Sequence, residues 1–113
     1  EWGYQLMRIR IYQIEMSLDE QNVAFRPYTE MQEKYPGDIP ANLYRMIYEG
    51  VVPTKEFSVV FYIFNMAHHH DYRARSLSVS DVIEVVEESS STFYYVDTIG
   101  FREVSFDASR LMK

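Results

Sequence analysis

Apolar and polar residues alternate along several short segments of the chain, which is the pattern of half-buried β-strands. The first such segment covers residues 8–16, where Ile9 and Ile11 alternate with arginines. From Tyr12 onward the apolar residues continue on the opposite parity. This change of phase predicts either a strand that is covered on both faces or a β-bulge that shifts the register.

Four more segments have strand character. Residues 23–25 follow a polar turn and are expected to pair back on the first strand as a hairpin. Residues 77–86 and 92–98 are rich in Val, Ile, Tyr and Ser, and the polar turn at residues 87–91 separates them. These two segments are predicted to form an antiparallel hairpin. After Gly100, residues 101–106 give one more short strand.

Three segments are predicted as helices. Residues 28–35 follow Pro27 and stop at Pro36-Gly37. Residues 41–49 contain two apolar pairs at i,i+4 spacing, and Gly50 is placed to cap that helix.

Residues 54–65 are the hardest to assign. Thr54 is a suitable N-cap, and Phe57, Phe61 and Phe64 follow a helical stripe, yet the same run is rich in strand formers. Periodicity alone leaves helix or strand open there. A helix at this place would have to be buried on most sides or face a partner.

Length and composition then limit the architecture. A chain of 113 residues with 47% hydrophobic and 16% aromatic content supports one folded domain. We expect an α+β fold in which a small antiparallel sheet, made of the N-terminal strand or hairpin plus the 77–98 hairpin, is packed by about three short helices. Residues 1–7 are interpreted as a leader or the remnant of a longer polypeptide, 8–106 as the domain, and 107–113 as a frayed tail.

Charge and cysteine content narrow the class of partner. The chain has no cysteine, which fits a cytoplasmic protein, and its longest apolar run is too short to span a bilayer. A net charge of −6 disfavours direct nucleic-acid binding. The acidity either serves solubility or forms an acidic surface that mimics nucleic acid, for which the candidate carboxylates are Glu84, Glu87, Glu88, Glu103 and Asp107.

Two motifs are the most informative part of the sequence. The first is Arg-Ala-Arg-Ser-Leu-Ser-Val-Ser-Asp-Val-Ile at residues 73–83, and the second is Tyr-Tyr-Val-Asp-Thr-Ile-Gly-Phe at residues 94–101. They resemble the signature of the YodL-like domain family, and the resemblance extends upstream through residues 10–13, 48–50, 64–65 and 71–72. The signature positions, which are also possible docking residues, are Arg73, Arg75, Ser76, Ser78, Ser80, Asp81, Tyr94, Tyr95, Asp97, Gly100 and Phe101.

The resemblance implies context more than mechanism. It implies a cytoplasmic accessory domain of bacteria, common in Firmicutes and in large multidomain proteins of conjugative elements and phages. It also favours a helix for residues 54–65. The chain departs from the family pattern at His70, where the family typically has Pro, and at Ala74, where Gly is common; both departures concern the shape of a loop.

Candidate chemistry is sparse. The run His68-His69-His70-Asp71 is a weak metal candidate, because adjacent residues rarely point at one ion and the chain has no other His or Cys. We therefore expect no metal and no cofactor. Ser76, Ser78 and Ser80 lie near Asp81 and Asp97, but the sequence has no G-x-S-x-G element for a catalytic serine.

Arginines and aromatics leave two further alternatives. Arg73 and Arg75 are expected either to form salt bridges with Asp81 and Asp97 that pin the loop to the hairpin, or to form a patch for an anion or a partner. Six aromatic residues supply either core and rim or a stacking platform for a nucleotide; they are Tyr44, Tyr48, Phe57, Tyr94, Tyr95 and Phe101.

The hypothesis that the sequence favours is a non-catalytic module that binds a protein, with an unknown oligomeric state. It predicts an exposed apolar patch. The alternatives are an acidic mimic that inhibits a DNA-acting enzyme of the host, and a small enzyme with a site around Asp81, Asp97 and Arg73.

Overall fold

The computed structural model describes residues 5–66 and 75–112, and its core element is one five-stranded antiparallel sheet. The strand order is β2-β1-β3-β4-β5, so the N-terminal strand lies between two strands that come much later in the chain. The strands are β1 (Met7–Ile14), β2 (Tyr44–Val52), β3 (Val82–Val86), β4 (Ser91–Val96) and β5 (Phe101–Val104).

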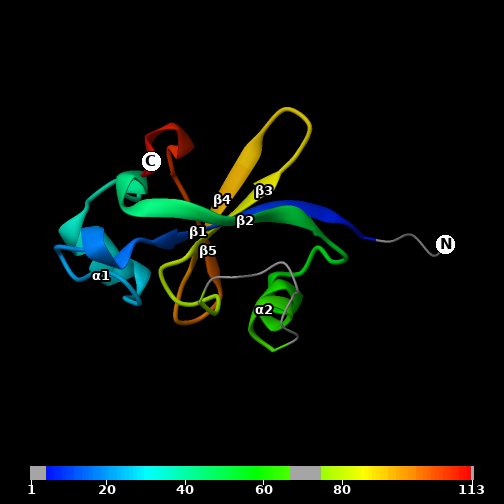
Figure 1. Cartoon of the computed structure of the whole chain (residues 1–113), viewed down its shortest axis with the longest axis horizontal. Helices are drawn as coiled ribbons and strands as arrows, with labels where there is room; N and C mark the ends of the chain where they lie inside the picture. Colours follow the sequence, from blue (N-terminus) through cyan, green and yellow to red (C-terminus); the bar gives the residue numbers. More distant parts are fainter. Residues whose placement is uncertain (1–4, 67–74, 113) are drawn as a thin grey trace.

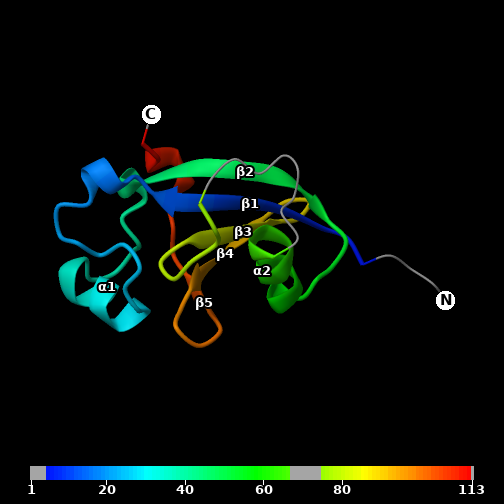
Figure 2. The same cartoon turned by 60° about the horizontal axis from the view of Figure 1, so that its bottom comes forward.

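Two α-helices accompany the sheet: α1 (Tyr28–Lys34) and α2 (Phe57–Asn65). Figure 1 places α1 at the end of the molecule away from the start of β1, and Figure 2 shows α2 lying against the sheet. Three short 3-10 turns complete the described structure, at Met16–Leu18, Ala41–Leu43 and Ala108–Arg110. The α+β class is confirmed, but the sheet dominates and the described residues contain two helices instead of three.

Both faces of β1 are covered, because two apolar clusters use its alternate residues. Ile9 and Ile11 join the cluster that α2 covers through Val60 and Phe64. Tyr12 and Ile14 belong to the second cluster, which includes residues of α1 and of the 3-10 turns Ala41–Leu43 and Ala108–Arg110. This two-sided burial explains why the apolar residues of β1 occupy both parities.

The register of β1 against β2 shifts between Ile11 and Tyr12, where the phase of the pattern changes, but the extra residue lies in β2 and not in β1. Ile11 pairs with Tyr48, whereas Tyr12 pairs with Met46, so Ile47 is an extra residue in β2. The bulge therefore turns the side chains before and after Ile47 to opposite faces of the sheet.

The predicted helix at residues 41–49 is wrong, because this segment is a 3-10 turn followed by β2. Gly50 does not cap a helix but pairs with Ile9 inside the sheet. A Cβ atom at Gly50 would overlap the hydroxyl of Tyr48 and lie 2.7 Å from its Cζ. The missing side chain lets the Tyr48 ring cross Gly50 and pack on Phe64, with ring centroids 4.8 Å apart.

Two other local predictions need correction. Residues 23–25 form a turn instead of a strand, because Asn22 and Phe25 adopt left-handed backbone conformations and both edges of β1 are already paired. The strand predicted to begin at Leu77 begins at Val82.

The structure confirms four other local predictions. They are the helix at 28–35, the helix within 54–65, the hairpin of β3 and β4, and the short strand after Gly100. The predicted N-cap at Thr54 is wrong, because α2 begins at Phe57 and Glu56 occupies the N-cap position. The hydroxyl of Thr54 accepts a hydrogen bond from Glu56 N at 2.9 Å, so it contacts the residue before the helix and not the helix itself.

Candidate functional site

The described part of the first signature motif, from Arg75 onward, contains a tight turn around a buried carboxylate. Asp81 is fully buried, and its Oδ2 accepts hydrogen bonds from Ser78 N at 2.8 Å and from Gln13 Nε2 at 3.0 Å. The backbone N–H of Asp81 donates back to Ser78 O at 3.1 Å. These bonds bend residues 78–81 out of strand geometry, which is why β3 starts only after them.

Burial gives this carboxyl group an unusual proton affinity. Burial raises the pKa of Asp81 to about 7, and the hydrogen bonds from Ser78 and Gln13 and the charge of Arg75 oppose that rise. The Nη2 atom of Arg75 lies 3.9 Å from Asp81 Oδ1, which is too long for a strong ion pair.

Ser80 ties this turn to a distant loop. It is fully buried with a φ of 85°, and its Oγ accepts a hydrogen bond from Phe25 N at 3.0 Å. The hydroxyl of Tyr44 donates to Ser80 O at 2.6 Å. Phe25 itself has a φ of 67°. The hydrogen bond between Phe25 N and Ser80 Oγ therefore joins two non-glycine residues that both adopt left-handed backbone conformations.

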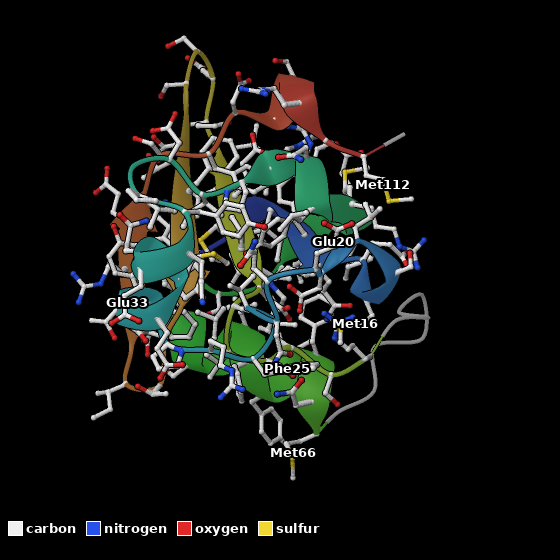
Figure 3. The ribbon with its side chains drawn as sticks, turned by 90° about the vertical axis from the view of Figure 1, so that its left-hand side faces the viewer. Met16, Glu20, Phe25, Glu33, Met66 and Met112 are labelled. Atoms are coloured by element: carbon white, nitrogen blue, oxygen red, sulfur yellow. The ribbon has the colours of Figure 1, made fainter. Side chains whose placement is uncertain are left out.

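Arg75 links the turn to β1. Its Nη2 donates to Ile14 O at 3.2 Å, and its guanidinium lies over the ring of Phe25, 5.1 Å from the centroid. Gln13 Nε2 donates to Arg75 O at 3.0 Å. Phe25 is an exposed residue, and Figure 3 shows it on the same side of the molecule as Met16.

Asn65, the last residue of α2, fixes the start of the same motif. Its side-chain amide donates to Leu77 O at 2.9 Å and accepts from Leu77 N at 2.6 Å. The Asn65 amide thus makes the two backbone hydrogen bonds that a neighbouring strand would otherwise make with Leu77. It holds the buried Leu77 against the α2 side of the sheet.

The second signature motif serves other parts of the fold. Asp97 Oδ1 accepts from Tyr28 N, at the start of α1, and its Oδ2 lies 3.7 Å from Arg102 Nε. The ring of the buried Tyr95 packs edge-on against the ring of Tyr28. The hydroxyl of Tyr95 donates a hydrogen bond to Arg26 O at 2.7 Å.

The other residues of the second motif lie in the β4–β5 turn and against α2. Gly100 takes a φ of 75° in the turn between β4 and β5. Tyr94 and Phe101 instead pack their rings on Phe57 of α2, with centroids 4.7 and 5.0 Å from it.

The structure therefore does not bring all predicted site residues together. Asp81 and Asp97 engage different groups, and only Arg75 of the two arginines can be placed beside Asp81. Arg73 and the run from His68 to Asp71 lie outside the described residues. Ser76 and Ser78 are in the turn, where Ser78 Oγ donates to Ser76 O at 2.9 Å.

Two of the six aromatic residues cannot belong to a stacking platform for a nucleotide. Tyr44 and Tyr95 are fully buried in one cluster, whereas Tyr48, Phe57 and Phe101 belong to the other. A nucleotide base cannot reach the first two rings.

Sequence reasoning missed a charged cluster on the face of the sheet away from α2. Glu84 is 3% exposed, accepts a hydrogen bond from the Tyr12 hydroxyl and pairs with Arg10 Nη1 at 3.0 Å. Arg10 also pairs with Glu49 at 2.8 Å. The opposite charges of Arg10 and Glu84 could have indicated this pair, because the two residues are cross-strand neighbours once β1 pairs with β3.

The buried position of Glu84 also corrects the proposed acidic surface. A buried, paired carboxylate cannot contribute to a surface that mimics nucleic acid. Glu103 and Asp107 do lie together, with Asp38, along an open groove of about 330 Å³ beside β5. Glu87 and Glu88 are exposed in the β3–β4 turn.

Apolar side chains are exposed along the outer side of α2 and at Met66, the residue that caps its C-terminal end. Tyr62 and Met66 are 59% and 66% exposed, and Val59 and Phe61 are also exposed. Val60 and Phe64 occupy the opposite side of the helix and are buried against the sheet. Figure 3 shows Met66 pointing away from the body of the protein.

Comparison with protein families is decisive for the relationship that the motifs suggested. The family model described as YodL-like domain matches residues 8–106, which is most of the chain. The protein belongs to the YodL-like domain family. Comparisons with curated proteins and with solved structures found no match.

In this YodL-like domain the described signature residues make contacts that connect the sheet with α1, α2 and the loop at Phe25. Neither described helix has the length and apolar run that a bilayer crossing requires. Among residues 5–66 and 75–112, no cluster of three carboxylate or imidazole groups is arranged to hold a metal ion.

Proposed function

We propose that this YodL-like domain is a non-catalytic protein-interaction module, and that its partner packs on the outer side of α2. The observation that carries the proposal is the exposed apolar stripe formed by Val59, Tyr62 and Met66. Their spacing of three and four residues places Val59 and Tyr62 on one side of α2, in line with Met66 at its C-terminal cap. Large apolar side chains that face water add nothing to the fold, whereas they stabilise a complex when a partner covers them.

The form of the stripe indicates the kind of partner. An amphipathic helix that presents residues at i, i+3 and i+7 fits an apolar groove or a second helix on another protein. Tyr62 and Met66 are suited to the centre of such a contact, because aromatic residues and Met are enriched at interfaces. Family membership and the lack of cysteine support a cytoplasmic accessory domain, and we extend this to proteins of bacterial mobile elements.

The contacts of Arg75 support a structural role for it. Its guanidinium already contacts Ile14 O and the Phe25 ring and lies near Asp81, so it is engaged within the domain. We expect an Arg75→Ala variant to melt at a lower temperature and to keep the partner that α2 binds.

The two alternatives have less support. An enzyme that uses Asp81 would need its carboxyl group to reach a substrate, but this group is fully buried. An acidic mimic would lose Glu84 from its proposed surface, because Glu84 is buried and paired with Arg10.

The test compares a variant of α2 with a matched control. Tyr62→Ser/Met66→Ser removes two exposed apolar side chains from the stripe, and Ile99→Ser removes one that is 92% exposed in the turn between β4 and β5. Both variants should unfold within about 0.5 kcal/mol per substitution of the native domain, because the side chains are exposed.

The readout is capture from bacterial lysate followed by titration of the purified partner in a calorimeter. We expect one protein to be retained by the native domain and by Ile99→Ser, and to be lost with the α2 variant. Retention of that protein by the α2 variant, at unchanged affinity, would contradict the proposal.

A further inference from the structure

A second candidate site lies where β1, β3, β4 and α2 meet. A cavity of about 310 Å³ opens there, and its apolar walls come from Met7, Phe57, Val85 and Tyr94. The rings of Phe57 and Tyr94 are in edge-on contact, with centroids 4.7 Å apart. This volume is at the lower end of ligand-binding cavities, so it suits a molecule about the size of one substituted ring.

Three charged side chains also line this cavity: Arg8, Lys55 and Glu87. The two cations come from β1 and from the loop between β2 and α2, so the fold brings them together from distant parts of the sequence. The cavity thus carries one more positive than negative charge, in a protein whose net charge is −6.

The two cations differ from most others in the domain. Five arginines form ion pairs within the described structure: Arg10, Arg26, Arg45, Arg75 and Arg102. Neither Arg8 nor Lys55 makes an ion pair or a side-chain hydrogen bond with another described residue. Both are exposed at the cavity and therefore available to an anion.

We propose that this cavity binds a small organic monocarboxylate, with its carboxylate between Arg8 and Lys55 and its apolar body against Phe57 and Tyr94. Arg and Lys recognise carboxylates through charge-assisted hydrogen bonds, and the aromatic walls supply the apolar contact. Glu87 lines the same space and repels a second negative charge, so the ligand is a monoanion and not a phosphate dianion. The site shares no residue with the α2 stripe.

The test uses three probes that share a phenyl ring: 3-phenylpropionate, the neutral 3-phenyl-1-propanol, and phenyl phosphate. NMR titration at pH 7.5 follows the ring signals of Phe57 and Tyr94 and the methyl signal of Met7, all of which line the cavity. We expect saturable shifts with the carboxylate. The alcohol should bind at least about tenfold more weakly, because it cannot accept charge-assisted hydrogen bonds from Arg8 and Lys55. The phosphate should also bind at least about tenfold more weakly, because Glu87 repels its second negative charge.

Two variants and one control test the assignment of the cations. Arg8→Gln and Lys55→Gln should each weaken 3-phenylpropionate about tenfold, whereas Lys34→Gln, an exposed lysine on α1, should leave it unchanged. Equal binding of the alcohol, tighter binding of the phosphate, unchanged affinity in either cation variant, or no saturable shift would each overturn the proposal.

Discussion

The buried carboxyl group of Asp81 predicts an unusual dependence of stability on pH. Its pKa is raised from 3.8 to about 7, with burial as the main cause. Since each pKa unit corresponds to about 1.4 kcal/mol, keeping this group ionised in the folded state costs about 4 kcal/mol. The sign follows from which state holds the proton: between pH 4 and 7 the folded domain keeps it and the unfolded chain does not.

The contribution of Asp81 is therefore most favourable below about pH 4 and is lost as the pH rises to 7. In that range the free energy of unfolding should fall by about 1.4 kcal/mol per pH unit from this group alone. The prediction concerns the difference between the native domain and Asp81→Asn, which cannot ionise, because contributions that both proteins share then cancel.

Urea denaturation at pH 5, 6, 7 and 8 measures this difference. We expect the native domain to lose about 2.5 kcal/mol relative to Asp81→Asn between pH 5 and pH 8, with most of the loss complete by pH 7.5. In Arg75→Met the fall should extend to higher pH, because the charge of Arg75 lowers the pKa of Asp81. A difference that stays constant across the range would refute the reasoning and show that Asp81 ionises as an ordinary carboxylate.

Three further predictions concern local geometry, and chemical denaturation measures each. Phe25→Gly should be more stable than Phe25→Ala by about 1 kcal/mol, because the position has a φ of 67° and Ala keeps the strain while losing the ring; equal stability would show that the backbone there is relaxed. Gly50→Ala should cost about 1–3 kcal/mol through overlap with the Tyr48 ring, and nearly nothing in a Tyr48→Ala background; the same cost in both backgrounds would place the clash elsewhere. Asn65→Ala should cost about 1–3 kcal/mol, since two backbone groups lose their hydrogen bonds, whereas Ser58→Ala on the exposed side of α2 should cost little.

The sequence was a good guide wherever a segment has a single local signal. The helix after Pro27 ends near Pro36-Gly37, and the β3–β4 hairpin follows from two apolar runs around a polar turn. The family relationship was likewise visible in two short motifs, and the family model matches residues 8–106.

The segment at residues 41–49 shows why other parts could not be predicted. A strand places every second residue on one face, but the bulge at Ile47 inserts one residue and switches the parity. The alternating signal disappears, and the apolar pairs at i,i+4 then imitate a helix. Only the pairing with β1, which depends on residues far away in the sequence, distinguishes the two structures.

The turn at residues 75–81 was missed for a different reason. Ser and Val alternate there as they do in a half-exposed strand, yet the turn is set by hydrogen bonds from Gln13, Ser78 and Phe25 to the side chains of Asp81 and Ser80. Two of these donors belong to the N-terminal part of the chain. No local pattern reveals that Asp81 is buried or that Phe25 is held outward.

The position of β1 between β2 and β3 has a consequence for how the domain is made in the cell. Arg8 pairs with Val86, near the other end of the domain, so β1 leaves the ribosome long before its second neighbour exists. Until then one edge of an apolar strand stays open to chaperones or to other nascent chains. The first strand of this domain is thus among the last to be enclosed, and closing such a long loop makes folding slow compared with a domain built from local hairpins.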